Sequence, residues 1–246
     1  MVPDLIEHLI KRGALFVCND SGGKDSQAMK IVLRRLVPAN QLLVLHAHLP
    51  EVEWEGSEDH IRKYAGDVPV IIAHGTKTFF EMVEHRQRFP SPSTRQCTSD
   101  LKRGPLEREI RRYLKAHPEF NGLVVNCMGM RAEESPGRSK LMSLKFNSAN
   151  SKAGREWYDW LPIHDLTTRQ VFDLIRAEGQ QPFWTYAKGM KRKSCCFCIM
   201  ACQSDLTIAA GLRPELYQRY VETERRLGFT LSMSRKTLPE ITGIAA

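Results

Sequence analysis

The chain has 246 residues, of which 42% are hydrophobic and 26% are charged, and its net charge is +8. This composition is ordinary for a soluble globular protein and excludes low-complexity classes. The longest apolar runs are too short to span a bilayer and no signal-peptide pattern opens the chain, so we expect a cytoplasmic protein without a membrane partner.

Apolar runs typical of strands alternate along the chain with patterns typical of helices. We predict strands over residues 14–19, 41–48, 68–73 and 123–128. We predict helices over residues 25–36, 56–64, 77–88, 105–116, 168–178 and 212–227. This alternation indicates βαβ units, and therefore an α/β fold with a doubly wound, mostly parallel sheet.

The length suits one α/β domain with a small addition. We expect residues 1–190 to form the nucleotide-binding domain. Residues 191–246 are expected to form a cysteine-containing and helical appendage packed on that same domain. Residues 135–154 are rich in Ser, Asn, Lys and Gly, and we expect them to form a mobile connection.

The stretch Ser21-Gly22-Gly23-Lys24-Asp25-Ser26 lies between the first predicted strand and the helix after it. Glycines let a backbone turn tightly and bring its N–H groups against oxygens, and a helix start adds partial positive charge. Lys24 adds a full charge, and Ser21 and Ser26 can donate hydroxyl hydrogen bonds. We therefore predict a phosphate-binding loop at the carboxyl end of the first strand. Asp25 is expected to cap the helix or to support the loop.

This loop resembles the PP-loop, S-G-G-x-D-S, of the ATP pyrophosphatase and adenine nucleotide alpha-hydrolase-like superfamily. Within that group the chain resembles the phosphoadenosine phosphosulfate (PAPS) reductase family, because three further blocks follow in that family's order. These blocks are Arg95-Gln96-Cys97-Thr98-Ser99-Asp100-Leu101-Lys102, Gly129-Met130-Arg131-Ala132-Glu133-Glu134-Ser135 and Ser194-Cys195-Cys196-Phe197-Cys198.

The resemblance implies an adenine nucleotide as ligand, either ATP or the sulfonucleotides PAPS and adenosine phosphosulfate (APS), together with Mg²⁺. Lys24, Ser26 and Arg131 are the expected catalytic residues. Arg131 follows the strand over residues 123–128, so its planar fork can reach the phosphates. The expected nucleotide contacts are Ser21, Gly22, Gly23, Lys24, Asp25, Ser26, His48, Gly129 and Arg131. Glu134 is expected either to hold Mg²⁺ or to pair with an arginine.

Seven cysteines without secretory context indicate a reducing compartment, where thiols bind metals or react. Cys195 and Cys198 form a C-x-x-C pair, whose thiolates converge on one metal centre. Cys97 resembles the other cysteine position of the iron–sulfur members of the family, and Cys196 is a possible fourth ligand. The resemblance thus implies a [4Fe–4S] cluster, with structural Zn²⁺ or a redox pair as alternatives. Cys18 and Cys127 lie within strand runs and are expected to be buried.

Three functions remain open on these observations. The chain resembles the sulfurtransferase component of Dnd- and Ssp-type DNA phosphorothioation systems. That resemblance implies an ATP pyrophosphatase that adenylates an acceptor for sulfur insertion, with DNA as acceptor, a sulfur-donor protein such as a cysteine desulfurase, and a possible homodimer. The net charge suits a DNA partner.

The first alternative is a PAPS or APS reductase. Such an enzyme uses a cysteine near its C-terminus, whereas here no cysteine follows Cys202. The second alternative is a non-catalytic nucleotide-binding subunit, which the intact loop disfavours.

Overall fold

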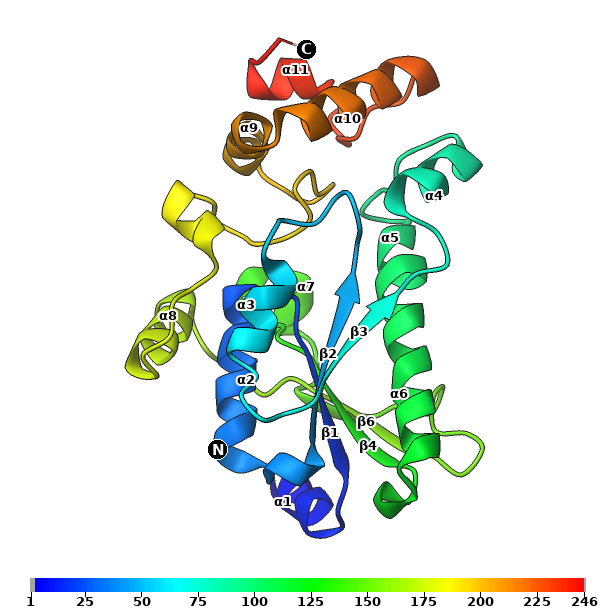
Figure 1. The fold of residues 1–246 in the computed structure, drawn as a ribbon, viewed down its shortest axis with the longest axis vertical. Coiled ribbons are helices and arrows are strands. Elements are labelled where there is room, and N and C mark those ends of the chain that lie inside the picture. Colours follow the sequence, from blue (N-terminus) through cyan, green and yellow to red (C-terminus); the bar gives the residue numbers. More distant parts are fainter. Residues whose placement is uncertain (1–2, 246) are drawn as a thin grey trace. The chain divides into compact units, whose positions relative to one another are not determined.

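The computed structural model describes residues 3–245, which divide into two compact units (Figure 1). The sheet unit comprises residues 3–46, 58–73 and 106–182, and the helical unit comprises residues 47–57, 74–105 and 183–245. Compact units are not the same as domains, so the expected division after residue 190 stays a prediction. Within the described residues, no helix combines the length and the apolar character that a membrane crossing requires.

A single mostly parallel sheet organises the first unit and confirms the predicted α/β fold. The strands of the described chain are β1 (Leu15–Asn19), β2 (Leu42–His48), β3 (Val70–His74), β4 (Leu123–Cys127), β5 (Leu144–Phe146) and β6 (Glu156–Trp160). Their order across the sheet is β3-β2-β1-β4-β6-β5. β1 pairs in parallel with both β2 and β4, β4 pairs in parallel with β6, and the edge strand β5 runs antiparallel to β6.

The sequence predicted the first four strands, but it did not predict β5 or β6. β6 is an internal strand, flanked by β4 and β5. β5 and the short helix α7 (Pro136–Ser139) lie within residues 135–154, where the sequence suggested only a connection. A search for apolar runs misses β5 because this strand is short. It misses β6 because acidic residues interrupt the apolar pattern.

The helices of the sheet unit cover both faces of the sheet, as expected of a doubly wound fold (Figure 1). They are α1 (Asp4–Lys11), α2 (Lys24–Leu36), α3 (Ser57–Lys63), α6 (Gly104–Ala116), α7 and α8 (Thr168–Ala177). Alternate residues of β1 enter the two cores: Phe16 packs with α1, α2, α3 and α8, and Val17 packs with α6. This alternation follows from the two-residue period of a strand.

The core on the α2 face contains Cys18 and Cys127, which are at most 2% exposed. Burial raises the pKa of both thiols far above the ordinary value, so they remain protonated at neutral pH. The expectation that these two cysteines are buried is confirmed.

The helical unit has its own apolar core, centred on aromatic rings. Its helices are α4 (Phe79–Arg86), α5 (Gln96–Thr98), α9 (Gln203–Leu212), α10 (Pro214–Leu227) and α11 (Leu238–Thr242). Tyr220 of α10 stacks on Phe89 with ring centroids 6.0 Å apart and meets Phe197 at 5.0 Å. Phe197 lies inside the C-x-x-C segment, so this core holds the cysteine loop in place.

Candidate functional site

The predicted phosphate loop joins β1 to α2 in the sheet unit. β1 ends at Asn19 and α2 begins at Lys24, so the turn is only four residues long. Gly22 adopts a positive φ of 73°, a conformation that side chains with a Cβ disfavour. Gly23 is the N-cap of α2 and has no side chain with which to cap it. The N–H groups and the dipole at the start of a helix favour an anion.

Asp20 organises this loop, and the sequence analysis did not single it out. One carboxylate oxygen accepts hydrogen bonds from the Gly22 N–H and the Ser26 hydroxyl, each at 2.8 Å. The other oxygen forms an ion pair of 2.6 Å with Lys30, and both side chains are at most 3% exposed. Burial alone favours the neutral acid, but Lys30 and these hydrogen bonds hold the pKa of Asp20 below its ordinary value.

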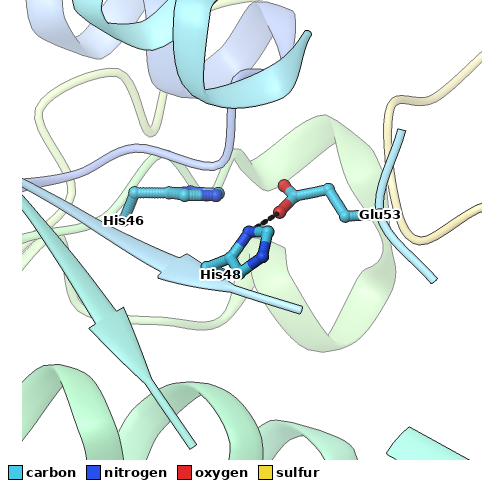
Figure 2. A group of neighbouring side chains, drawn as sticks. All are labelled: His46, His48 and Glu53. Atoms are coloured by element: carbon cyan, nitrogen blue, oxygen red, sulfur yellow. Dashed lines mark hydrogen bonds and ion pairs between the residues drawn. The ribbon is translucent and has the colours of Figure 1, made fainter. Parts of the chain in front are cut away.

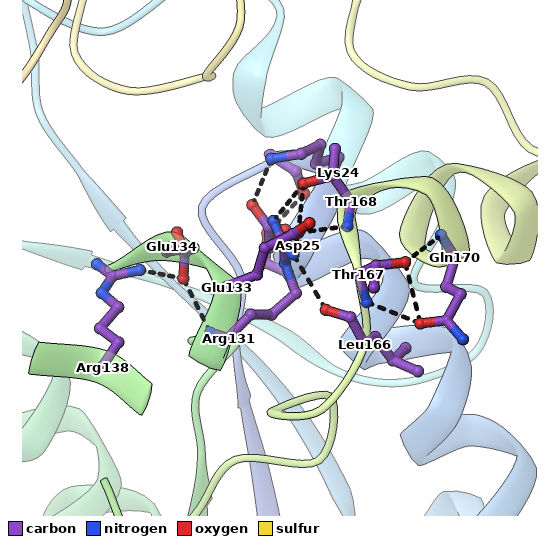
Figure 3. A network of polar contacts seen from close by, with 12 residues as sticks. Lys24, Asp25, Arg131, Glu133, Glu134, Arg138, Leu166, Thr167, Thr168 and Gln170 are labelled. Atoms are coloured by element: carbon purple, nitrogen blue, oxygen red, sulfur yellow. Dashed lines mark hydrogen bonds and ion pairs between the residues drawn. The ribbon is translucent and has the colours of Figure 1, made fainter. Parts of the chain in front are cut away.

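Lys24 lies at the first position of α2 and is 5% exposed (Figure 3). Its ammonium donates to one oxygen of Asp25 at 2.8 Å. The other oxygen of Asp25 accepts from Arg131 Nε at 2.7 Å. Of the two roles expected for Asp25, the structure shows the supporting one, because the N-cap of the helix is Gly23.

The Arg131 guanidinium is almost fully engaged by protein groups and its side chain is 3% exposed. Besides Asp25, it contacts the Glu133 carboxylate at 2.6 Å, the Leu166 carbonyl at 3.0 Å and the Thr168 hydroxyl at 3.1 Å. The Arg131 guanidinium and Thr168 lower the pKa of Glu133 to about 2. Arg131 therefore links Asp25 of the loop to the start of α8 through its hydrogen bonds. Its direct contact with phosphate stays a prediction.

Glu134 pairs with an arginine, one of the two roles that the sequence allowed. Its carboxylate accepts the Arg131 backbone N–H at 2.8 Å and forms an ion pair with Arg138 (Figure 3). Both interactions fix the turn that follows β4. A carboxylate used in this way has little freedom to hold Mg²⁺, so a metal ion at this site would be bound mainly through nucleotide phosphates.

Gly129 lies directly beside the first turn of α2. A methyl group at this position would come within 3.0 Å of the carbonyl carbon of Asp25 and 3.1 Å of the Ser26 nitrogen. The absence of a side chain therefore lets the exit of β4 approach the loop. This packing requirement explains the glycine whether or not it also contacts a nucleotide.

His46 and His48 both lie near the end of β2 but have different partners. In the sheet unit, His46 is buried and its Nδ1 donates to the Asp20 carbonyl at 2.8 Å, which supports the loop from behind. In the helical unit, His48 Nδ1 lies 3.1 Å from the Glu53 carboxylate (Figure 2). Glu53 also forms an ion pair of 3.2 Å with Lys193, whose side chain is 3% exposed. The predicted nucleotide contact of His48 stays a prediction.

The helical unit brings Cys97, Cys195 and Cys198 near one ammonium group, that of Lys102. The Lys102 nitrogen lies 3.7 Å from the Cys195 sulfur. Interaction with Cys195, and then with Cys198 and Cys97, raises the pKa of Lys102. Burial raises the pKa of the Cys97 and Cys195 thiols, and Lys102 opposes that shift. A metal centre here must displace the thiol protons, which the positive charge of Lys102 favours.

Cys196 has different surroundings from the other three cysteines. It is 1% exposed and belongs to the apolar core of the helical unit. Its sulfur lies 4.0 Å from an Arg213 nitrogen, and its backbone N–H donates to the Val52 carbonyl at 2.9 Å. Burial raises the pKa of its thiol to about 12. These contacts fit an anchor for the loop better than a fourth metal ligand.

Comparison with models of protein families identifies the family. Residues 16–201 match the model of the phosphoadenosine phosphosulfate reductase domain. An uncharacterized protein of Methanocaldococcus jannaschii is 24% identical over 85% of this chain and 47% of its own length. An uncharacterized 37.8 kDa protein of Escherichia phage 186 is 30% identical over 60% of this chain and 42% of its own length. The chain thus spans less than half the length of these two relatives.

Among solved structures, the fold is similar to that of PAPS reductase from Candida auris in its phosphate complex. The TM-score is 0.50 at 13% identity, and the match covers 79% of this chain and 96% of that one. At this identity the likeness shows the fold alone. The match to the family model covers most of the chain, and the chain therefore belongs to the phosphoadenosine phosphosulfate reductase domain family.

Proposed function

We propose that the loop from Asp20 to Ser26 binds the phosphate chain of an adenine nucleotide. The observation that carries this proposal is the start of α2 behind a glycine N-cap, joined to a loop whose shape Asp20 holds. Backbone N–H groups and the helix dipole favour an anion there, and Lys24 supplies the one full positive charge within the loop. Membership of the PAPS reductase family supports an adenine nucleotide as that anion.

We further propose that the protein uses ATP to activate an acceptor for sulfur transfer. An acceptor oxygen attacks the α-phosphorus of ATP, the bond to the β-phosphate breaks, and pyrophosphate leaves. A sulfur nucleophile then displaces AMP from the activated acceptor. Lys24 and the loop N–H groups stabilise the charge that develops on pyrophosphate. Ser26 shapes the loop through Asp20, and Arg131 positions Asp25 and so Lys24.

DNA is the acceptor that this proposal names, and the net charge of +8 supports it. A separate protein, such as a cysteine desulfurase, supplies the sulfur. If that sulfur arrives as a persulfide, its transfer consumes two electrons from a thiol reductant. A homodimer is compatible with this scheme, and the molar mass of the protein in solution tests whether it forms.

We propose that Cys97, Cys195 and Cys198, the cysteines around Lys102, are the three protein ligands of a metal group. A [4Fe–4S] cluster bound by three thiolates leaves one iron able to hold a sulfur atom. Lys102 balances the negative charge that deprotonated cysteines bring, whether the metal is iron or zinc. Metal analysis after anaerobic purification separates the two metals. Cys195→Ser is expected to remove the metal and its visible absorption, whereas Cys202→Ser, at an exposed cysteine, is expected to keep both.

Pyrophosphate release from ATP tests the central step of the proposal. We expect Lys24→Ala to abolish release with the fold intact, because the Lys24 ammonium pairs with Asp25, the next residue in the chain. Lys152→Ala, at an exposed lysine of the same unit, is the matched control and is expected to behave as wild type. Equal release by wild type and Lys24→Ala would contradict the proposed role of the loop.

A second candidate function is reduction or cleavage of a sulfonucleotide. The match to the PAPS reductase domain family favours it. Both candidates use the same phosphate loop, so they differ in the ligand. Competition between ATP and PAPS for the purified protein distinguishes them: the sulfur-transfer proposal expects ATP to bind productively and to yield pyrophosphate, whereas the alternative expects sulfite from PAPS.

A further inference from the structure

A groove of about 600 Å³ in the helical unit carries several positive charges. Its lining comes from the residues before and along α4, from Arg88 after that helix, from Gln96 of α5 and from two residues that follow α5. We call it the basic groove; it is lined by Thr76, Lys77, Met82, His85, Arg86, Arg88, Gln96, Asp100 and Leu101. None of these residues belongs to the phosphate loop or to the cysteine cluster.

The cations of the basic groove lack protein counterions. Among the interactions of residues 3–245, no ion pair involves Lys77, Arg86 or Arg88, which project from three positions around α4. Asp100 is the one carboxylate of the lining, and its nearest identified partner is the Ser99 hydroxyl, at 2.6 Å. The groove therefore has a surplus of positive charge that nothing in the described chain neutralises.

A second groove in the same unit, also of about 600 Å³, shows the opposite arrangement. There Arg219 forms an ion pair of 2.7 Å with Glu51 and lies over the Phe80 ring at 3.8 Å. Arg226 forms a two-pronged ion pair with Glu84. We call it the paired groove, because both of its arginines have carboxylate partners. The unpaired cations of the basic groove are thus not a general property of this unit.

Helix electrostatics account for only part of the charge. His85 and Arg86 lie in the last turn of α4, where positive charge is stabilised by the helix dipole. Lys77 instead immediately precedes the N-cap Thr78, at the positive end of the helix, where a cation is disfavoured. Arg88 follows the C-cap Gln87 and is exposed. The position of Lys77 is therefore unfavourable for the stability of the folded protein. An unfavourable position of this kind is expected at a binding site, where a bound anion compensates for it.

We infer that the basic groove binds the sugar–phosphate backbone of a nucleic acid without reading its sequence. Lysine and arginine contact phosphate oxygens, and the polar Thr76 and Gln96 add hydrogen bonds of the kind that position a backbone. The lining has no Phe, Tyr or Trp on which bases stack, so the contacts are to phosphate rather than to bases. The inference rests on the proposed function for the chemistry done on the nucleic acid, but not for the binding itself.

The salt dependence of DNA binding tests this inference. The groove variant is Lys77→Gln/Arg88→Gln, and the matched control is Arg219→Gln/Arg226→Gln, which removes the same charge from the paired groove. Fluorescence anisotropy with a short labelled duplex is measured between about 50 and 200 mM salt. We expect the slope of log K against log salt to become shallower by about 2 in the groove variant and to stay unchanged in the control. Two unrelated duplex sequences are expected to give the same result.

Equal slopes for the two double variants would overturn the inference. It would also be overturned if the groove variant lost binding to a phosphorylated acidic peptide but bound DNA as wild type does. Pyrophosphate release is measured on the same proteins at a saturating concentration of DNA, the proposed acceptor, and is expected to be unchanged in the groove variant. A protein that binds DNA through the groove but releases no pyrophosphate would refute the proposed function alone. A protein with normal release and equal slopes would refute the groove alone.

Discussion

The ion pair between Asp20 and Lys30 gives the sharpest prediction about how the phosphate loop is held. Both side chains are at most 3% exposed, and their charged atoms lie 2.6 Å apart. Lys30 has one further identified acceptor, the Ile61 carbonyl at 3.2 Å. Removal of one partner leaves a buried charge without compensation, which costs about 3–5 kcal/mol. We therefore expect Asp20→Asn and Lys30→Met each to lower the free energy of unfolding by about that amount.

The double variant separates this interaction from other effects of the substitutions. In Asp20→Asn/Lys30→Met no buried charge remains, so the loss is expected to be smaller than the sum of the single losses by about 2 kcal/mol or more. Urea denaturation of all four proteins measures this coupling energy. Additive losses would refute the ion pair as the element that holds the loop.

The same pair predicts an acid dependence of stability. The pKa of Asp20 in the folded protein lies below its ordinary value of 3.8. Its contribution is therefore fully present above about pH 4 and is lost as the pH falls through the lowered folded value. Asp20→Asn is expected to lack this component, so its stability should fall less steeply than that of wild type in this range. Parallel curves for the two proteins would contradict the assignment.

Two further predictions concern close packing and a buried acceptor. Gly129→Ala is expected to lower the free energy of unfolding by about 1–3 kcal/mol and to weaken ATP binding, because its methyl group meets the first turn of α2. Gly211 of α9 has open space around it, so Gly211→Ala is the control and is expected to stabilise the protein by up to about 1 kcal/mol. Thermal melting of the two variants tests whether the close contact at Gly129 causes its loss of stability. Glu224→Ala is expected to cost about 1–3 kcal/mol for each lost acceptor, since its carboxylate accepts the N–H groups of Leu231 and Leu238 at 2.7 and 2.9 Å. Hydrogen exchange should quicken at those two amides, and unchanged exchange would argue against this role.

The sequence predicted the phosphate loop because the signal is local. A strand, two glycines, a lysine and a helix start lie within a short stretch, and their geometry follows from backbone preferences. The same reasoning found β1 to β4, because each of them contains at least three consecutive apolar residues. It did not find β6, because Glu156 and Asp159 interrupt the apolar pattern even though Trp157 and Trp160 are buried.

The polar network around the loop was harder to predict, because its members are distant in sequence. Asp20 lies directly before Ser21, but the sequence does not show which groups it binds. Its partners are the Gly22 N–H and the ammonium of Lys30, a residue of α2. The contact of Arg131 with phosphate stays a prediction, and the structure adds the Asp25 and Glu133 carboxylates that bind its guanidinium. Sequence indicates which residue types can bind phosphate, whereas only the fold shows which of them are already engaged.

The cysteines also show that spacing in the sequence does not reveal the surroundings of a side chain. The spacing of Cys195 and Cys198 indicates convergent thiols, the family resemblance pointed to Cys97, and the structure adds the ammonium of Lys102. Cys196 lies between the two, and the sequence left it as a possible fourth ligand. Its side chain enters the apolar core, which depends on residues from three separate segments of the helical unit.

A crystal structure of the protein with a non-hydrolysable ATP analogue shows where the phosphates bind. We expect the phosphate chain to lie against the N–H groups between Gly22 and Ser26, with an oxygen on the Lys24 ammonium. A well-ordered analogue whose phosphates lie elsewhere, with this loop left unoccupied, would contradict this expectation.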